Sequence, residues 1–133
     1  MIGLGGPYNT RKMLDGCFAI LFVAVALGTT LAFLHLRPDG RSPPWQLGAL
    51  HGCLGAVGLG VLFWALRGPP RGLTNGTAQF GEFAFTLLLL ALPVGLAILA
   101  RVYNGRRPGL LLALHAGLAI SGFVILAAYV FAA

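Results

Sequence analysis

Charged residues are scarce in this chain. Of its 133 residues, 9% are charged and 58% are hydrophobic, whereas about a quarter of the residues in a soluble domain are charged. So few charges cannot cover a surface that faces water, which argues against a soluble globular domain. The two cysteines, Cys17 and Cys53, both fall in apolar segments, so a disulfide framework is not indicated. The chain also has no phosphate-binding loop, nucleophile triad or Cys-x-x-Cys, and we predict no catalytic residues.

The apolar residues form four long runs. Each run reaches the ~20 residues that cross the hydrocarbon core of a bilayer. The backbone finds no hydrogen-bond partner in lipid and strand-like alternation is absent, so the runs must be helices. The first run is also too long for a cleavable signal peptide. We therefore predict an all-α membrane protein, with residues 1–133 forming one four-transmembrane-helix bundle. The predicted helices cover about 13–36, 45–66, 80–101 and 109–132.

Basic residues gather at the ends of these runs and give a net charge of +6. In a membrane protein such residues anchor helix ends and contact lipid headgroups, so we expect a lipid bilayer as partner and no nucleic acid. Side A denotes the membrane face where the first run begins, and side B the opposite face. Side B carries five Lys or Arg and side A four. Because these counts are nearly equal, the expected orientation rests on the amino terminus, which we expect to be cytoplasmic. Side A and both termini would then face the cytoplasm of a bacterial inner membrane.

The second half of the chain repeats the pattern of the first. Leu and Ala matches are common in membrane helices, so the loop residues and histidines carry the alignment. An offset of 65 aligns Gly40, Arg41 and Pro43 with Gly105, Arg106 and Pro108, and an offset of 64 aligns His51 and Gly58 with His115 and Gly122. Both copies begin on side A. The pattern therefore predicts two parallel-repeat helical hairpins, related by an axis along the membrane normal, with the second and fourth helices facing each other.

The aligned histidines lie at equal depth. His51 is seven residues after Pro44, and His115 is seven residues after Pro108. At about 1.5 Å per residue, both lie roughly 10 Å below helix starts on side B. Small residues stand one and two turns further along on the same faces, namely Gly55, Gly58, Ala119 and Gly122. A flat macrocycle could lie against the backbone at these positions.

A b-type haem with two histidine ligands needs neutral imidazoles on facing helices and cations for its propionates. The sequence Ala-Leu-His, followed by small residues in an apolar helix, occurs at both His51 and His115. This pattern resembles the membrane-bound b-type cytochromes built as four-helix bundles. Those cytochromes often hold two haems on four histidines, and this chain has three histidines, so the resemblance implies one haem. Arg41 and Arg106, which the repeat places alike, are the best candidates to contact propionates or lipid phosphates.

Other interpretations of the histidine pair stay open. Small residues in membrane helices commonly serve close helix packing, and an imidazole can simply bind a backbone carbonyl. A metal site without haem or a proton relay is a further alternative. Cys53 lies on a different helix face from His51, which weakens the metal alternative. His35, at the end of the first run, is interpreted as an interface residue, and Asp15 and Glu82 as acidic residues favoured at helix N-termini.

Two functions are compatible with this pattern. The first is a membrane electron-transfer subunit with one bis-histidine haem, which exchanges electrons with quinone or a partner redox protein. The second is a cofactor-free accessory or structural subunit of a larger membrane bioenergetic complex. In both, other membrane subunits are expected partners. A small transporter is a third possibility, because parallel repeats occur in transporters, although no charged residue lies at the midplane.

Overall fold

The computed structural model describes residues 7–39 and 41–132. Its helices are α1 (Pro7–His35), α2 (Trp45–Ala65), α3 (Phe80–Tyr103) and α4 (Leu110–Ala132). The described residues contain no strand, and each helix is long and apolar enough to cross a membrane. The predicted all-α, four-helix fold is confirmed, and it indicates an integral membrane protein.

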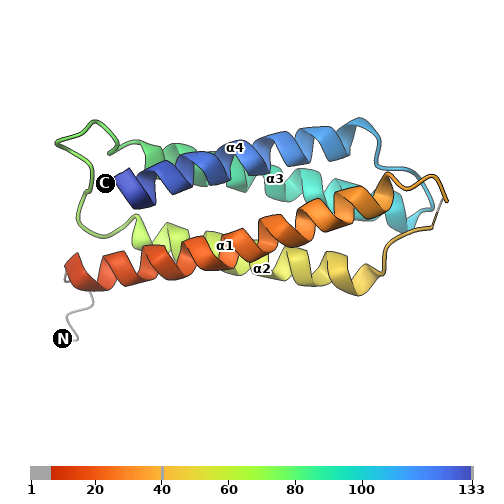
Figure 1. Cartoon of the computed structure of the whole chain (residues 1–133), viewed down its shortest axis with the longest axis horizontal. Helices are drawn as coiled ribbons and strands as arrows, with labels where there is room; N and C mark the ends of the chain where they lie inside the picture. Colours follow the sequence, from red (N-terminus) through yellow and green to blue (C-terminus); the bar gives the residue numbers. More distant parts are fainter. Residues whose placement is uncertain (1–6, 40, 133) are drawn as a thin grey trace.

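The helices run alternately up and down (Figure 1). The α1–α2 and α3–α4 connections lie at one end, side B, and the α2–α3 connection lies at the other end, side A, where α1 begins and α4 ends. Packing is most extensive within the two hairpins, α1 with α2 and α3 with α4, and is weaker between α1 and α4 and between α2 and α3. The helices therefore form a four-sided bundle in which α2 and α4 are diagonal.

The helix boundaries differ most from the prediction at α1. This helix begins at Pro7, six residues before the predicted start, and proline is well suited to a first helical turn. Asp15 therefore lies about two turns inside the helix, beyond the reach of the terminal dipole, and its predicted place at a helix start is wrong. Glu82 does lie in the first turn of α3, as predicted.

The packed core occupies the side-A half of the bundle. Its apolar members are Leu14, Cys17, Leu21, Ala24, Leu59, Leu62, Ala65, Ala84, Leu88, Ala91, Leu126, Tyr129 and Val130. In the side-B half, Pro108 is the one buried residue among the described residues 25–39, 41–57 and 92–121. The inward faces there are half-buried at most, so the side chains fill the two halves of the bundle unequally.

The packing of α1 and α3 matches residue for residue at an offset of 67. The buried residues Leu14, Cys17, Leu21 and Ala24 of α1 correspond at that offset to the buried Gly81, Ala84, Leu88 and Ala91 of α3. The sequence alignment predicts an offset of 65 between α1 and α3. The buried residues of these two helices match at an offset of 67 instead. The reason lies on side B, where the α1–α2 connection (36–44) has three residues more than the α3–α4 connection (104–109). The parallel repeat itself stays a prediction.

The side-A connection is tied to the end of α4. The Asn75 side-chain amide donates a hydrogen bond to the carbonyl of Ala132. The Asn75 carbonyl oxygen accepts hydrogen bonds from the Thr77 backbone N–H, at 3.2 Å, and from the Thr77 hydroxyl, at 2.7 Å. Gly76, between these residues, has φ of 75°, a conformation that favours glycine. This turn therefore links the α2–α3 connection to the end of α4 on side A.

Candidate functional site

The two predicted ligands, His51 on α2 and His115 on α4, meet across the diagonal of the bundle. Their ring centroids are 5.9 Å apart and their ring planes are 79° apart. Both side chains are half-buried. Both lie on the side-B side of the packed core, where the inward-facing residues are only partly buried. The expectation that the two imidazoles lie at one depth and face each other matches this geometry.

Each imidazole is anchored by a backbone carbonyl of its own hairpin. Nδ1 of His51 lies 2.8 Å from the carbonyl oxygen of Ala24, and Nδ1 of His115 lies 2.9 Å from that of Ala91. A carbonyl oxygen can only accept a hydrogen bond, so Nδ1 carries the proton in both rings. In a neutral imidazole this leaves the lone pair on Nε2. Nε2 is then the atom that is free to bind a metal or to accept a proton.

Glycines on α1 and α3 make these contacts possible. Gly28 and Gly95 each follow the accepting alanine by four residues. In a helix, a side chain at this position would cover the turn that contains the alanine carbonyl. A Cβ on Gly28 would lie 2.7 Å from Cε1 of His51, and one on Gly95 would lie 3.0 Å from Cε1 of His115. The absence of a side chain therefore lets each ring reach the helix backbone.

The small residues predicted beside the histidines divide into two groups. A Cβ on Gly55 would meet no atom within 4 Å, and Gly55 and Ala119 are half-buried. In contrast, a Cβ on Gly58 would lie 2.6 Å from Cδ2 of Leu21, and one on Gly122 would lie 3.2 Å from the Ala84 carbonyl oxygen. Gly58 and Gly122 thus mediate close packing of α2 on α1 and of α4 on α3, whereas Gly55 and Ala119 lie in the partly buried side-B half.

The two predicted arginines differ in their surroundings. Arg106 lines an open groove of about 420 Å³ on side B, together with Ala100, Arg101 and Asn104. The groove is shaped partly by Arg101, whose Nε donates to the Arg107 carbonyl oxygen at 3.2 Å. Arg41 is exposed, and its backbone N–H donates to Oδ1 of Asp39 at 3.3 Å. Of the two, Arg106 is the one that shares a concave polar surface.

The remaining candidate ligands lie apart from the pair. His35 donates from Nδ1 to the Leu31 carbonyl oxygen of its own helix, at 2.9 Å, and Cys53 is exposed. Among the described residues, no three His, Cys, Asp or Glu side chains are grouped so that they could hold a metal ion. The donor set at this depth therefore consists of the two imidazoles.

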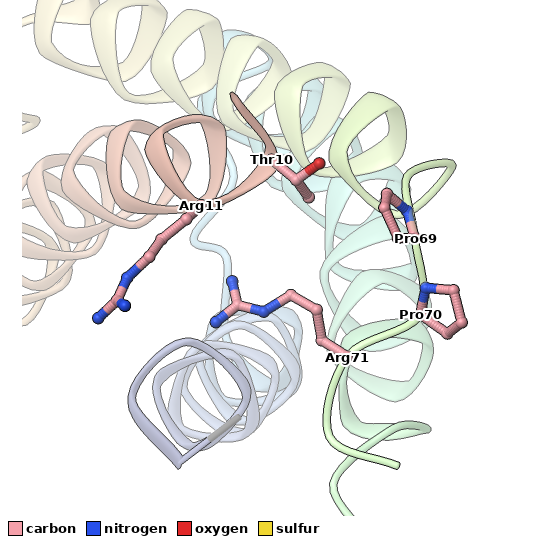
Figure 2. A pocket seen from close by; sticks show the side chains of 5 residues that line it. All are labelled: Thr10, Arg11, Pro69, Pro70 and Arg71. Carbon is pink, nitrogen blue, oxygen red and sulfur yellow. The ribbon is translucent and has the colours of Figure 1, made fainter. Parts of the chain in front are cut away.

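A second cavity, of about 200 Å³, lies on side A, at the opposite end from the histidines. Thr10, Arg11, Pro69, Pro70 and Arg71 line it. In Figure 2 the Arg71 side chain extends away from the two prolines, toward the side on which Arg11 lies. This cavity belongs to the junction of α1 with the α2–α3 connection, and it is separate from the histidine pair.

A comparison of the chain with protein-family models, curated proteins and solved structures finds no match. The site is therefore characterised by its geometry alone. The residues that the sequence-based prediction missed are Ala24, Gly28, Ala91 and Gly95. Their signal is an Ala-x-x-x-Gly spacing that recurs at an offset of 67, which the alignment at 65 concealed.

Proposed function

We propose that the protein is a membrane electron-transfer subunit that carries one b-type haem between His51 and His115. The observation that supports this proposal most is the facing pair of imidazoles, each with Nδ1 bound to a backbone carbonyl. Ligand histidines are commonly oriented in this way by a hydrogen bond from the second ring nitrogen. Electron exchange with quinone or with a partner redox protein is the expected role.

The spacing of the rings fits axial ligation. Two imidazole nitrogens at ~2 Å on opposite sides of an iron place the ring centres roughly 6 Å apart. The observed separation is 5.9 Å. His51 and His115 would hold the haem, which supplies a one-electron Fe(III)/Fe(II) couple when bound.

The surroundings of the pair also fit a flat macrocycle. The inward faces of the side-B half are half-buried at most, and a Cβ on Gly48 or Gly55 would meet no atom within 4 Å. Arg101 and Arg106 line the groove on the same side of the membrane. Guanidinium groups bind carboxylates well, so these residues would serve propionates that point toward side B. Arg41, which is exposed on that side, is a further candidate.

A cofactor-free accessory subunit of a larger membrane complex is the second candidate. It is favoured by Gly58 and Gly122, which pack the helices of each hairpin closely. The Nδ1 hydrogen bonds would by themselves suffice to hold two neutral histidines in an apolar bundle. In that case a neighbouring membrane subunit would cover the partly buried residues of the side-B half.

An absorption spectrum of the purified protein, oxidised and then reduced with dithionite, distinguishes the two candidates. The chain is expressed with ample haem, and bound haem is quantified as its pyridine complex. The electron-transfer function predicts a low-spin b-type spectrum and one haem per chain. A colourless protein that is folded and helical would refute this function and favour the accessory subunit.

A further inference from the structure

Ala24, Gly28 and His51 form a three-residue arrangement in the first hairpin that Ala91, Gly95 and His115 repeat in the second. In each, an imidazole on one helix donates from Nδ1 to an alanine carbonyl on the neighbouring helix. A Cβ on the glycine four residues after that alanine would come within 2.7 Å of Cε1 of the same ring in the first hairpin and within 3.0 Å in the second. We call each arrangement an imidazole seat.

We infer that Gly28 and Gly95 are positioning residues, which act with the carbonyls of Ala24 and Ala91 to hold the two ligand planes nearly at right angles. This inference rests on the proposed haem function. The two seats act on different rings from different hairpins, and the ring planes that result are 79° apart.

Two contacts fix the orientation of each ring. The hydrogen bond from Nδ1 to the carbonyl restrains rotation of the ring about its Cβ–Cγ bond. The glycine backbone lies against the Cε1 edge, where a Cβ on Gly28 would come within 2.7 Å of His51 and one on Gly95 within 3.0 Å of His115. An alanine at either glycine would therefore push the ring away from its carbonyl and change the orientation of the ring plane, because its methyl group would overlap the ring.

The angle between axial imidazole planes has a direct magnetic signature. Parallel planes split the iron d orbitals strongly and give a rhombic low-spin EPR spectrum. Crossed planes leave two of these orbitals nearly equal in energy and give a highly anisotropic low-spin spectrum, with one dominant low-field feature. The wild-type ferric protein is expected to give the anisotropic form.

The test is EPR spectroscopy of the haem-loaded full chain, with the variants Gly28→Ala and Gly95→Ala. Each variant is expected to lose the anisotropic signal, either to a rhombic low-spin spectrum or to a high-spin one. Gly16→Ala on α1 and Gly60→Ala on α2 are matched controls, since a Cβ at either position would meet no atom within 4 Å. Both controls are expected to keep the wild-type spectrum.

The outcomes separate this inference from the function on which it rests. A wild-type protein without low-spin haem would refute the proposed function. Low-spin haem with a rhombic wild-type spectrum, or glycine variants with the wild-type spectrum, would overturn the inference alone. Should the variants fail to accumulate, ¹⁵N NMR of histidine-labelled wild-type protein without haem decides the point. Protons on Nδ1 of both His51 and His115 support the seats, and protons on Nε2 overturn them.

Discussion

Two imidazoles in an apolar bundle need polar partners, because an unsatisfied polar group in hydrocarbon costs several kcal/mol. Each ring has one partner for Nδ1, the carbonyl of Ala24 or Ala91. The ring centroids of His51 and His115 are 5.9 Å apart, and the Nε2 atom of each ring carries the lone pair. An iron between the two rings would bind both Nε2 atoms at once. A packing role for the histidines would need only the Nδ1 hydrogen bonds.

The replacement of either histidine tests whether His51 and His115 together bind the proposed haem. His51→Ala and His115→Ala should each abolish the six-coordinate low-spin spectrum, because His35 is bound to Leu31 at the end of its own helix and lies too far toward side B to substitute. His35→Ala is the matched control and should keep the spectrum. A low-spin bis-histidine spectrum that survives in either ligand variant would contradict the assignment.

The charge of Arg106 should influence the haem potential. Its guanidinium lines the side-B groove, and a positive charge near the haem stabilises the ferrous form relative to the ferric form. Arg106→Gln is therefore expected to lower the midpoint potential, on the order of tens of millivolts for a solvent-screened charge. Arg67→Gln on side A, where Arg67 stacks over Phe63 at 4.3 Å, should leave the redox titration unchanged. Equal potentials in Arg106→Gln and wild type would exclude the propionate role.

The facing histidine pair could be predicted from the sequence, but the alanine and glycine residues that hold each ring could not. His51 and His115 follow prolines by equal counts in two helices that begin on one side, so their common depth follows from helix geometry. Gly28 and Gly95 align with each other only if the side-B connections differ by three residues in length. In helices rich in Leu and Ala, many alignment offsets give similar numbers of identical residues. Only the packing of α1 and α3 in the structure distinguishes the offset of 67 from the others.

Among the helices, each hairpin contains one complete imidazole seat. The carbonyl, the glycine and the imidazole of a seat all come from the two helices of one hairpin, and these helices are the most extensively packed pairs. Gly58 and Gly122 allow this close approach, since their Cβ positions are already filled by neighbouring helices. The sequence alone places these two glycines beside a haem, because a small residue next to a cofactor and a small residue at a helix contact give the same pattern.

A methyl group at the packing glycines should destabilise the hairpins. Gly58→Ala would place Cβ 2.6 Å from Leu21, and Gly122→Ala would place it 2.9 Å from Leu88, so each variant overpacks its hairpin and should cost about 1–3 kcal/mol. The expected readout is a lower thermal unfolding midpoint in detergent. Gly60→Ala on α2 meets no atom within 4 Å and should unfold like the wild type. Unchanged midpoints in both packing variants would show that the helices accommodate the methyl groups.

At the scale of the whole molecule, the two halves of the bundle differ. The side-A half has the packed core and the Asn75 hydrogen bond to the end of α4. The side-B half has half-buried inward faces and the facing histidines. The four-helix fold itself was predictable, because four apolar runs leave few other arrangements in a membrane. The unequal filling was not, because apolar residues occur at similar density along the whole length of each run.

Haem should therefore stabilise the folded bundle as a whole. A ligand that binds only the folded state raises stability by mass action, by about 2.7 kcal/mol at a concentration 100 times its Kd. We expect the thermal unfolding midpoint to rise when haem is added to the purified chain, and this rise to disappear in His51→Ala. An identical rise in that variant would mean that haem binds elsewhere, for example at a nonspecific apolar surface.

Near-infrared magnetic circular dichroism of the oxidised protein reports whether two imidazoles ligate a haem in this bundle. The energy of the charge-transfer band in this region depends on the pair of axial ligands of a low-spin ferric haem. One haem per chain held by His51 and His115 should give the band of a bis-imidazole pair. A band characteristic of any other ligand pair, or a high-spin spectrum, would contradict it.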